Sequence, residues 1–160
     1  SFADLYGVYF ATDGQHLEHR IHVNHNVPNA KSRVNYKGAL AGDQAHTVWI
    51  GDVYIHKGAD GTDTYELNRN LLLTDVARAD SVPNLHIETG EIVGEGHAST
   101  TGRFDDEQLF YLQSRGIPAE IARRLVIRGF FAEIISKLKN TEIEDRLMQR
   151  IDDELSKVGQ

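Results

Sequence analysis

The sequence contains no cysteine, and it has only three prolines and one methionine among its 160 residues. Without cysteine the chain forms no disulfide, offers no thiolate nucleophile and holds no all-cysteine metal site. It also lacks an apolar run near the length of about 20 residues that a membrane-spanning helix needs. We therefore expect a cytoplasmic protein with no membrane role. The chain opens with Ser1 rather than Met, which predicts a piece of a longer protein.

Positive charge is scarce, with 17 basic against 24 acidic residues and a net charge of -7. Such a surface repels a phosphate backbone, which argues against nucleic-acid binding. The sequence also has no nucleophile elbow, no phosphate-binding glycine loop and no zinc-protease helix. These absences predict a protein that is not an enzyme and holds no permanent cofactor.

Short extended runs, each bounded by Gly, Asn or Asp, fill the first hundred residues. In the clearest run, residues 46–56, both alternating faces are rather apolar, which predicts a strand covered on both sides. Turn signals recur at spacings that suit a barrel, a sandwich or a solenoid, and no strict repeat decides among them. The expected strands are 6–11, 19–25, 33–41, 47–56, 64–72, 84–88 and 92–98.

The last third of the chain has the periodicity of helices. Acidic residues at 105–107 suit the start of a first helix, and Gly116 supplies a left-handed stop. Pro118 suits the first turn of a second helix that reaches Lys139. Thr141 and Glu144 have the spacing of a capping box and predict the start of a third helix.

The segment Glu95–Gly116, together with Asn29–Gly38 and Asn70–Leu73, resembles the SufB/SufD family of iron-sulfur cluster assembly scaffolds. The resemblance covers roughly residues 20–138. It implies a mainly β protein with C-terminal α structure: a right-handed β-helix, a single-stranded solenoid, ending over residues 1–102, and a helical segment over residues 103–160. The missing cysteine makes the C-terminal part of SufD the nearest match, since SufB-type chains need that thiol.

The resemblance also indicates an assembly site. In SufD-like proteins a histidine followed five residues later by Gly, and then by Arg-hydrophobic-Asp-Asp-Glu, lies at the interface with SufB and is implicated in cluster assembly. His97 and residues 102–107 match that frame, and Glu95 stands where many relatives have cysteine. His97 and Glu95 are therefore the candidate ligands of a transient iron-sulfur cluster, whose thiolate must come from SufB. No residue is predicted to be catalytic.

The expected partners are a SufB-like scaffold, contacted through the late strands, and a SufC-like ABC-type ATPase, contacted through the helices. An open solenoid end exposes strand edges, so a homodimer of the isolated chain is also expected. The candidate residues for binding SufC are Phe104, Asp105, Phe110, Tyr111, Arg115, Phe130 and Phe131.

Two other interpretations remain open: a metal-dependent β-fold enzyme that uses several of the eight histidines, and a structural solenoid that only self-associates. The histidines spaced by three from His16 to His25 resemble a metal comb, but residues three apart on a strand point to opposite faces. We therefore interpret them as ordinary strand histidines. His46, His56 and His86 have no evident partner at ligand spacing.

Two further polar patterns are interpreted as structural. Lys31, Arg33 and Lys37 alternate along one strand face. They could form a basic line inside or beside an assembly tunnel, but pairing with carboxylates on the next coil is the favoured interpretation. Glu66, Asn68 and Asn70 also share a face, which suggests an asparagine ladder with no catalytic role.

Overall fold

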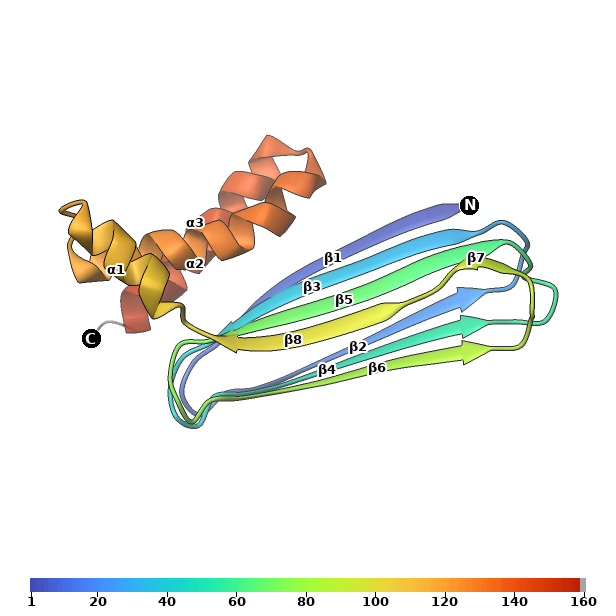
Figure 1. Cartoon of the computed structure of the whole chain (residues 1–160), viewed down its shortest axis with the longest axis horizontal. Coiled ribbons are helices and arrows are strands. Elements are labelled where there is room, and N and C mark those ends of the chain that lie inside the picture. Colours follow the sequence, from blue (N-terminus) through green and yellow to red (C-terminus); the bar gives the residue numbers. More distant parts are fainter. Residues whose placement is uncertain (159–160) are drawn as a thin grey trace.

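The structure, a computed structural model, describes residues 1–158 as a parallel β-solenoid followed by helices (Figure 1). This confirms the predicted fold class. The strands are β1 (Phe2–Ala11), β2 (His16–His25), β3 (Lys31–Leu40), β4 (His46–Ile55), β5 (Thr62–Leu72), β6 (Arg78–Ile87), β7 (Ile92–Gly94) and β8 (His97–Arg103). The helices are α1 (Asp106–Ser114), α2 (Ala119–Ile135), the short 3-10 helix η1 (Ser136–Leu138) and α3 (Thr141–Val158).

The strands form two facing sheets. Sheet A has the order β1-β3-β5, after which both β7 and β8 pair with β5; sheet B has the order β2-β4-β6. Each pairing is parallel, so each coil from β1 to β6 adds one strand to each sheet, and the last strands, β7 and β8, extend sheet A alone. The change from strand to helix, at Arg103 and Asp106, lies beside the predicted boundary at residue 102.

Along each strand, side chains point alternately into the solenoid and to its outer face, and the inward-pointing side chains fill the space between the sheets. On β4, Trp49, Val53 and Ile55 are fully buried inside the solenoid, whereas Val48 and Ile50 on the outer face are only half-buried. The prediction that both faces of this strand are covered is therefore wrong. The helices lie on the other sheet, and the outer face of sheet B is left with a mixture of apolar and charged side chains.

Helices α2 and α3 cover the outer face of sheet A near the ends of β1, β3 and β5 (Figure 1). Phe131 is completely buried there against a cluster that includes Phe10 and Ala39. Burying a phenylalanine stabilises by about 1.5–3 kcal/mol, so this cluster is the main attachment of the helices. No helix in residues 1–158 combines the length and hydrophobicity that a bilayer crossing requires.

Several element boundaries differ from the expectation. β6 begins at Arg78 rather than at Asn84, and the run predicted at 92–98 is divided into β7 and β8. The third helix is capped by Asn140 rather than Thr141: the Asn140 side chain accepts from the Ile143 N–H at 3.2 Å, and the Asn140 N–H donates to Glu144. The capping box is therefore present but begins one residue earlier.

Candidate functional site

His97 lies at the exposed end of the solenoid. It is the first residue of β8, and its register partner on β5 is Glu66. β8 pairs with β5 alone, so within residues 1–158 its second edge has no partner strand. The His97 side chain is exposed, on the last rung of sheet A. A histidine that was predicted to face a second subunit thus lies on an open strand edge.

A bulge lies within β7, four residues before this histidine. The register shifts between Thr62 and Asp63 of β5, where Val93 is the extra residue and is 71% exposed. Glu95 follows it in the short connection to β8 and is also exposed. The structure therefore places both predicted ligands at the open end, two residues apart on the stretch of chain that follows the bulge. Bulges of this kind re-aim side chains at strand edges.

Glu66 is the residue of this region that sequence reasoning missed. Its side chain points into the solenoid and is 1% exposed, and neither carboxylate oxygen has a hydrogen-bond partner within the described chain. Burial, and next the charge of Asp52, raise the pKa of Glu66 to about 7. A buried carboxyl group without a partner is costly, so it holds its proton far more tightly than a solvated glutamate does.

Space for this carboxyl group comes from Gly51 on the facing sheet. A Cβ atom at Gly51 would lie 2.4 Å from Glu66 Oε1, and the Trp49 ring would be equally close. Only glycine at this position of β4 lets the glutamate extend across the interior. The sequence does contain a signal for this group: Glu66 is a charged residue at an inward position of an alternating strand. Grouping it with Asn68 and Asn70, which share its face, hides that signal.

Those asparagines are hydrogen-bonded to each other on the same inward face of β5. Asn70 donates to Asn68 at 2.8 Å, and Tyr9 donates to Asn70 at 2.5 Å. Ser81 of β6 donates to Asn68, which connects these side chains to sheet B. The side chains of Asn68 and Asn70 are therefore hydrogen-bonded as the predicted asparagine ladder requires, and Glu66 lies two residues before Asn68 on the same inward face of β5.

The histidines of β2 behave as strand geometry requires. His19 and His25 point inward, where His19 stacks on Tyr9 and His25 bonds Ser32 at 2.9 Å. His16 and His22 lie on the outer face. Burial lowers the pKa of both inward histidines, which keeps them neutral. In residues 1–158 no group of three or more His, Asp or Glu side chains is placed to hold one metal ion.

The basic residues of β3 make two kinds of pair. Lys31 and Arg33 both contact Asp63 on the next coil, with Arg33 Nη2 to Asp63 Oδ1 at 2.8 Å. Lys37 instead bonds Glu133 of α2 at 2.6 Å and donates to the Phe130 carbonyl. The next-coil prediction is thus confirmed for the first two residues and wrong for Lys37, which anchors a helix.

The residues predicted to bind SufC separate into two groups. Phe110 and Tyr111 of α1 are 73% and 56% exposed, and Arg115 lies over the Tyr111 ring with its guanidinium carbon 5.1 Å from the ring centre. Asp105 caps α1 by accepting from the N–H of Glu107 at 2.9 Å. This group lies on an accessible surface, where α1 buries none of its side chains.

The remaining three aromatic residues pack inward. Phe131 is fully buried, so it does not belong to any exposed surface of this chain. Phe130 is half-buried beneath the Lys37 ammonium, and Phe104 lies under the Arg123 guanidinium at 5.2 Å. Ile121 and Leu125 of α2, although apolar, are about half exposed.

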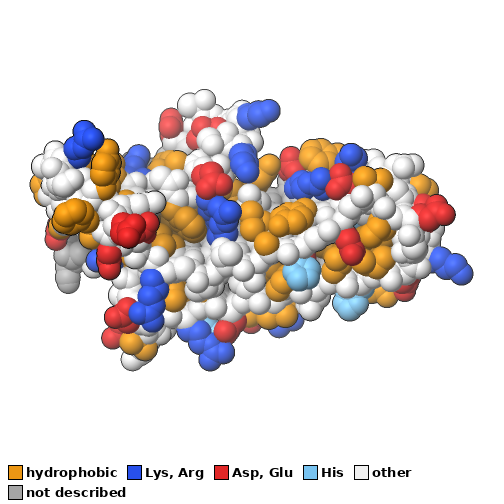
Figure 2. Space-filling model, viewed as in Figure 1, with side chains coloured by type: hydrophobic (Ala, Val, Ile, Leu, Met, Phe, Trp, Pro, Cys, Tyr) orange, Lys and Arg blue, Asp and Glu red, His pale blue; other side chains and the backbone are white. Residues whose placement is uncertain are grey.

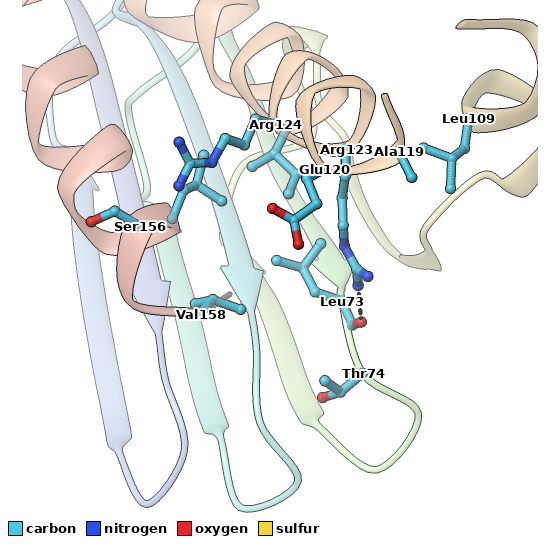
Figure 3. A pocket seen from close by; sticks show the side chains of 11 residues that line it. Leu73, Thr74, Leu109, Ala119, Glu120, Arg123, Arg124, Ser156 and Val158 are labelled. Carbon is cyan, nitrogen blue, oxygen red and sulfur yellow. Dashed lines mark hydrogen bonds between the residues drawn. The ribbon is translucent and has the colours of Figure 1, made fainter. Parts of the chain in front are cut away.

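A pocket of about 540 Å³ lies where the helices meet the end of β5 (Figure 3). Arg123 reaches across it and donates to the Leu73 carbonyl at 2.6 Å, while Glu120 and Arg124 point toward the same space from α2. The Arg123 bond satisfies a carbonyl at the end of a strand. The hydrogen bond from Arg123 to Leu73 therefore connects α2 to the solenoid beside this pocket.

Exposed apolar residues accompany the open last coil. Val82 and Ile87 of β6 are 43% and 39% exposed, and Val93 lies beside β8. In Figure 2, which shows the face bearing β6 and β8, apolar side chains are interspersed with histidines and charges. A free strand edge with apolar residues around it is typical of a protein-protein interface.

Comparison with known proteins agrees with this architecture. A family profile described as SUF system FeS cluster assembly, SufBD core domain, matches residues 1–130. An iron-sulfur cluster assembly SufBD family protein of Mycobacterium tuberculosis is 66% identical over 159 residues, 96% of this chain and 40% of the relative. SufD of Escherichia coli is 33% identical over 132 residues, covering 82% of this chain and 31% of SufD.

SufD of Bacillus subtilis is 37% identical over 116 residues, 72% of this chain and 26% of that protein. The chain thus spans about two fifths of the length of its mycobacterial relatives. The profile match covers most of the chain and reaches from β1 into α2, so it includes the open last coil and His97. The chain belongs to the SufB/SufD family of iron-sulfur cluster assembly proteins.

Proposed function

We propose that this chain is the C-terminal part of a SufD-like, non-enzymatic scaffold subunit that pairs with a SufB-like protein through its last coil. The observation that supports this most directly is the exposed His97 on the unpaired edge of β8. A strand edge offers a row of free N–H and C=O groups to a second chain. A SufB-like strand added there would place its own side chains next to the imidazole.

The transient cluster is the cargo of this site. His97 supplies an imidazole nitrogen, and the thiolate comes from the SufB-like partner, because this chain has no cysteine. Glu95 adds exposed carboxylate oxygens two residues before His97. Such hard oxygen ligands suit iron ions better than a sulfide-rich cluster. We therefore assign the Glu95 carboxylate to iron entry and the imidazole to the cluster itself.

The helical segment is the proposed docking surface for a SufC-like ATPase. Its exposed apolar residues, Phe110 and Tyr111 of α1 with Ile121 and Leu125 of α2, are the kind that anchor interfaces. ATP-driven dimerisation of SufC would move the two scaffolds relative to each other. The attachment of α2 to sheet A through Lys37 and Phe131 supports transmission of such a movement to the solenoid.

Co-purification tests the partners. The full-length protein is expressed with SufB-like and SufC-like proteins from the same organism, and the complex is isolated on a tag carried by the scaffold. Phe110→Ala with Tyr111→Ala should release the ATPase and keep the SufB-like protein. Ile143→Ala on α3, an exposed apolar residue away from α1, is the matched control. A folded full-length protein that binds neither partner contradicts the proposal.

His97→Ala in the purified complex tests the assembly site. We expect loss of cluster formation, followed by visible absorption, with unchanged recovery of both partners. Ser99→Ala, on the same strand and face, is the matched control and should leave cluster yield unchanged. Equal cluster yield in His97→Ala would reduce the histidine to a structural residue of the interface.

Self-association through the same open coil is the second candidate. The exposed edge of β8 is available to another copy when no SufB-like chain is present. Sedimentation of the chain alone should show a homodimer that dissociates when the SufB-like protein is added. A dimer that persists beside the SufB-like protein would favour a purely structural solenoid. The metal-enzyme interpretation has no three-ligand site to support it in residues 1–158.

A further inference from the structure

Two histidines from different coils meet on the outer face of sheet B. His16 opens β2 and His46 opens β4, and the two residues are register partners in the parallel sheet. Their Nδ1 atoms are 3.0 Å apart and their ring centres 4.6 Å apart. Because they are 30 residues apart in the chain, spacing within the sequence does not reveal this pair: the sequence indicates an ordinary strand histidine at His16 and a histidine without an evident partner at His46.

A carboxylate fixes the orientation of the second imidazole. Asp80 of β6 accepts from His46 Nε2 at 2.8 Å, and Arg78 Nε pairs with the same carboxylate at 3.0 Å. An ionised carboxylate only accepts, so Nε2 of His46 carries the proton and Nδ1 presents its lone pair toward His16. This is the arrangement in which a histidine is oriented to bind a metal ion.

The first imidazole has a carboxylate nearby but no hydrogen bond to it. The Glu18 carboxylate lies 4.0 Å from His16 Nε2, and Arg20 pairs with Glu18. The His16 ring is therefore less firmly oriented than the His46 ring. The tautomer with its proton on Nε2 gives His16 an Nδ1 lone pair that faces that of His46.

We propose that His16 and His46 form a surface site for one divalent transition-metal ion, such as zinc, with water completing the coordination. Bonds of about 2.0–2.1 Å at a tetrahedral angle separate two nitrogens by about 3.3 Å, close to the spacing present here. In the absence of a metal ion, one proton between the two Nδ1 atoms replaces it. The site offers nitrogen ligands, so it selects zinc, nickel or copper over magnesium and calcium.

This site is separate from the assembly site. The two histidines lie on sheet B, where those strands begin, whereas His97 belongs to sheet A at the open coil. Both side chains are accessible, with His16 53% and His46 31% exposed. An ion can therefore bind without unfolding the solenoid or occupying the edge of β8.

Calorimetric titration of the whole chain with zinc chloride tests the proposal. The wild type should bind one equivalent, and His16→Gln and His46→Gln should each weaken that binding at least tenfold. Asp80→Asn should weaken it about 10-fold or more, because loss of a carboxylate behind a ligating histidine has that effect. Magnesium should give no binding at the same concentrations.

His22→Gln is the matched control, since His22 lies on the same strand and face but its register partner is Asp52 rather than a histidine. It should bind zinc as the wild type does, and circular dichroism should show unchanged folding in every variant. Absence of stoichiometric zinc binding by the wild type would overturn the proposal. So would an equal loss in His22→Gln, or full retention in His16→Gln.

Discussion

The helix-covered face of sheet A and the interior next to the open last coil each bury one ionisable side chain, but only one of the two has a partner. Lys37 and Glu66 are both 1% exposed. Lys37 bonds Glu133 and the Phe130 carbonyl, whereas the Glu66 carboxylate bonds nothing in the described chain. The first region is complete within one chain. The second has a polar group that the fold does not satisfy, as expected where function depends on a further ligand or subunit.

The largest expected effect lies on the covered face. Phe131→Ala should lower the free energy of unfolding by about 3–5 kcal/mol, because it opens a cavity where the helices meet sheet A. Phe110→Ala, which removes an exposed ring of α1, should change stability by less than about 0.5 kcal/mol. Urea denaturation followed by circular dichroism measures both. Similar losses for the two variants would mean that the helices are not held by this cluster.

The next effect concerns the open coil and depends on pH. Glu66 has a pKa of about 7 when folded and an ordinary value of 4.5 when unfolded. Below the unfolded pKa its contribution is fully present, and stability falls as pH rises toward 7, because only the unfolded state then releases the proton. The total fall is on the order of 3 kcal/mol, from about 1.4 kcal/mol per pKa unit.

Glu66→Gln isolates this contribution, since it keeps the shape and removes the titration. The difference in stability between wild type and variant should change between pH 4.5 and 7 and be constant above that range. Carboxyl groups with a lowered pKa, such as Asp63 and Glu133, change stability in the opposite direction at lower pH and cancel in the difference. A difference that is independent of pH would show that Glu66 already has a partner.

A smaller effect is expected at the paired charge. Glu133→Gln should cost about 1–3 kcal/mol, since the Lys37 ammonium then stays buried with only a carbonyl and the Phe130 ring beside it. Glu133 itself is half exposed, which favours the lower part of that range. Lys37→Met should cost less, because it removes the charge together with its desolvation. Thermal denaturation measures both variants. If Lys37→Met destabilised the protein more than Glu133→Gln, the ion pair would not matter for stability.

The contrast between the two regions also explains how far the sequence could be interpreted. Alternation, glycine-bounded turns and helix stops were enough to place most strands and helices, since these signals are local. Resemblance was needed to choose a solenoid, because the coils have no strict repeat. Phe131 and Phe110 illustrate the limit: both are helical aromatics, and only the packing of α2 on sheet A separates the buried ring from the exposed one.

Contacts between side chains on different coils could not be predicted from the sequence either. The pairing of His16 with His46, and of His97 with Glu66, depends on a register that neither segment specifies alone. Glu66 was assigned to the ladder with Asn68 and Asn70 because the three share a face. Its lack of a partner follows from Gly51 on the opposite sheet, which leaves space for the carboxyl group but provides no donor.

The smallest expected effect on stability belongs to the residue with the largest proposed role. His97→Ala should change the free energy of unfolding of this chain by less than about 0.5 kcal/mol, because the ring is exposed on the last rung and has no hydrogen-bond partner that would be lost within the described residues. The same substitution should abolish cluster formation in the complex with the SufB-like and SufC-like proteins. Urea denaturation of the chain and absorption of the complex measure the two effects separately. A loss of stability comparable to that of Phe131→Ala would place His97 in the structural core, and the open coil would then resemble the covered face rather than contrast with it.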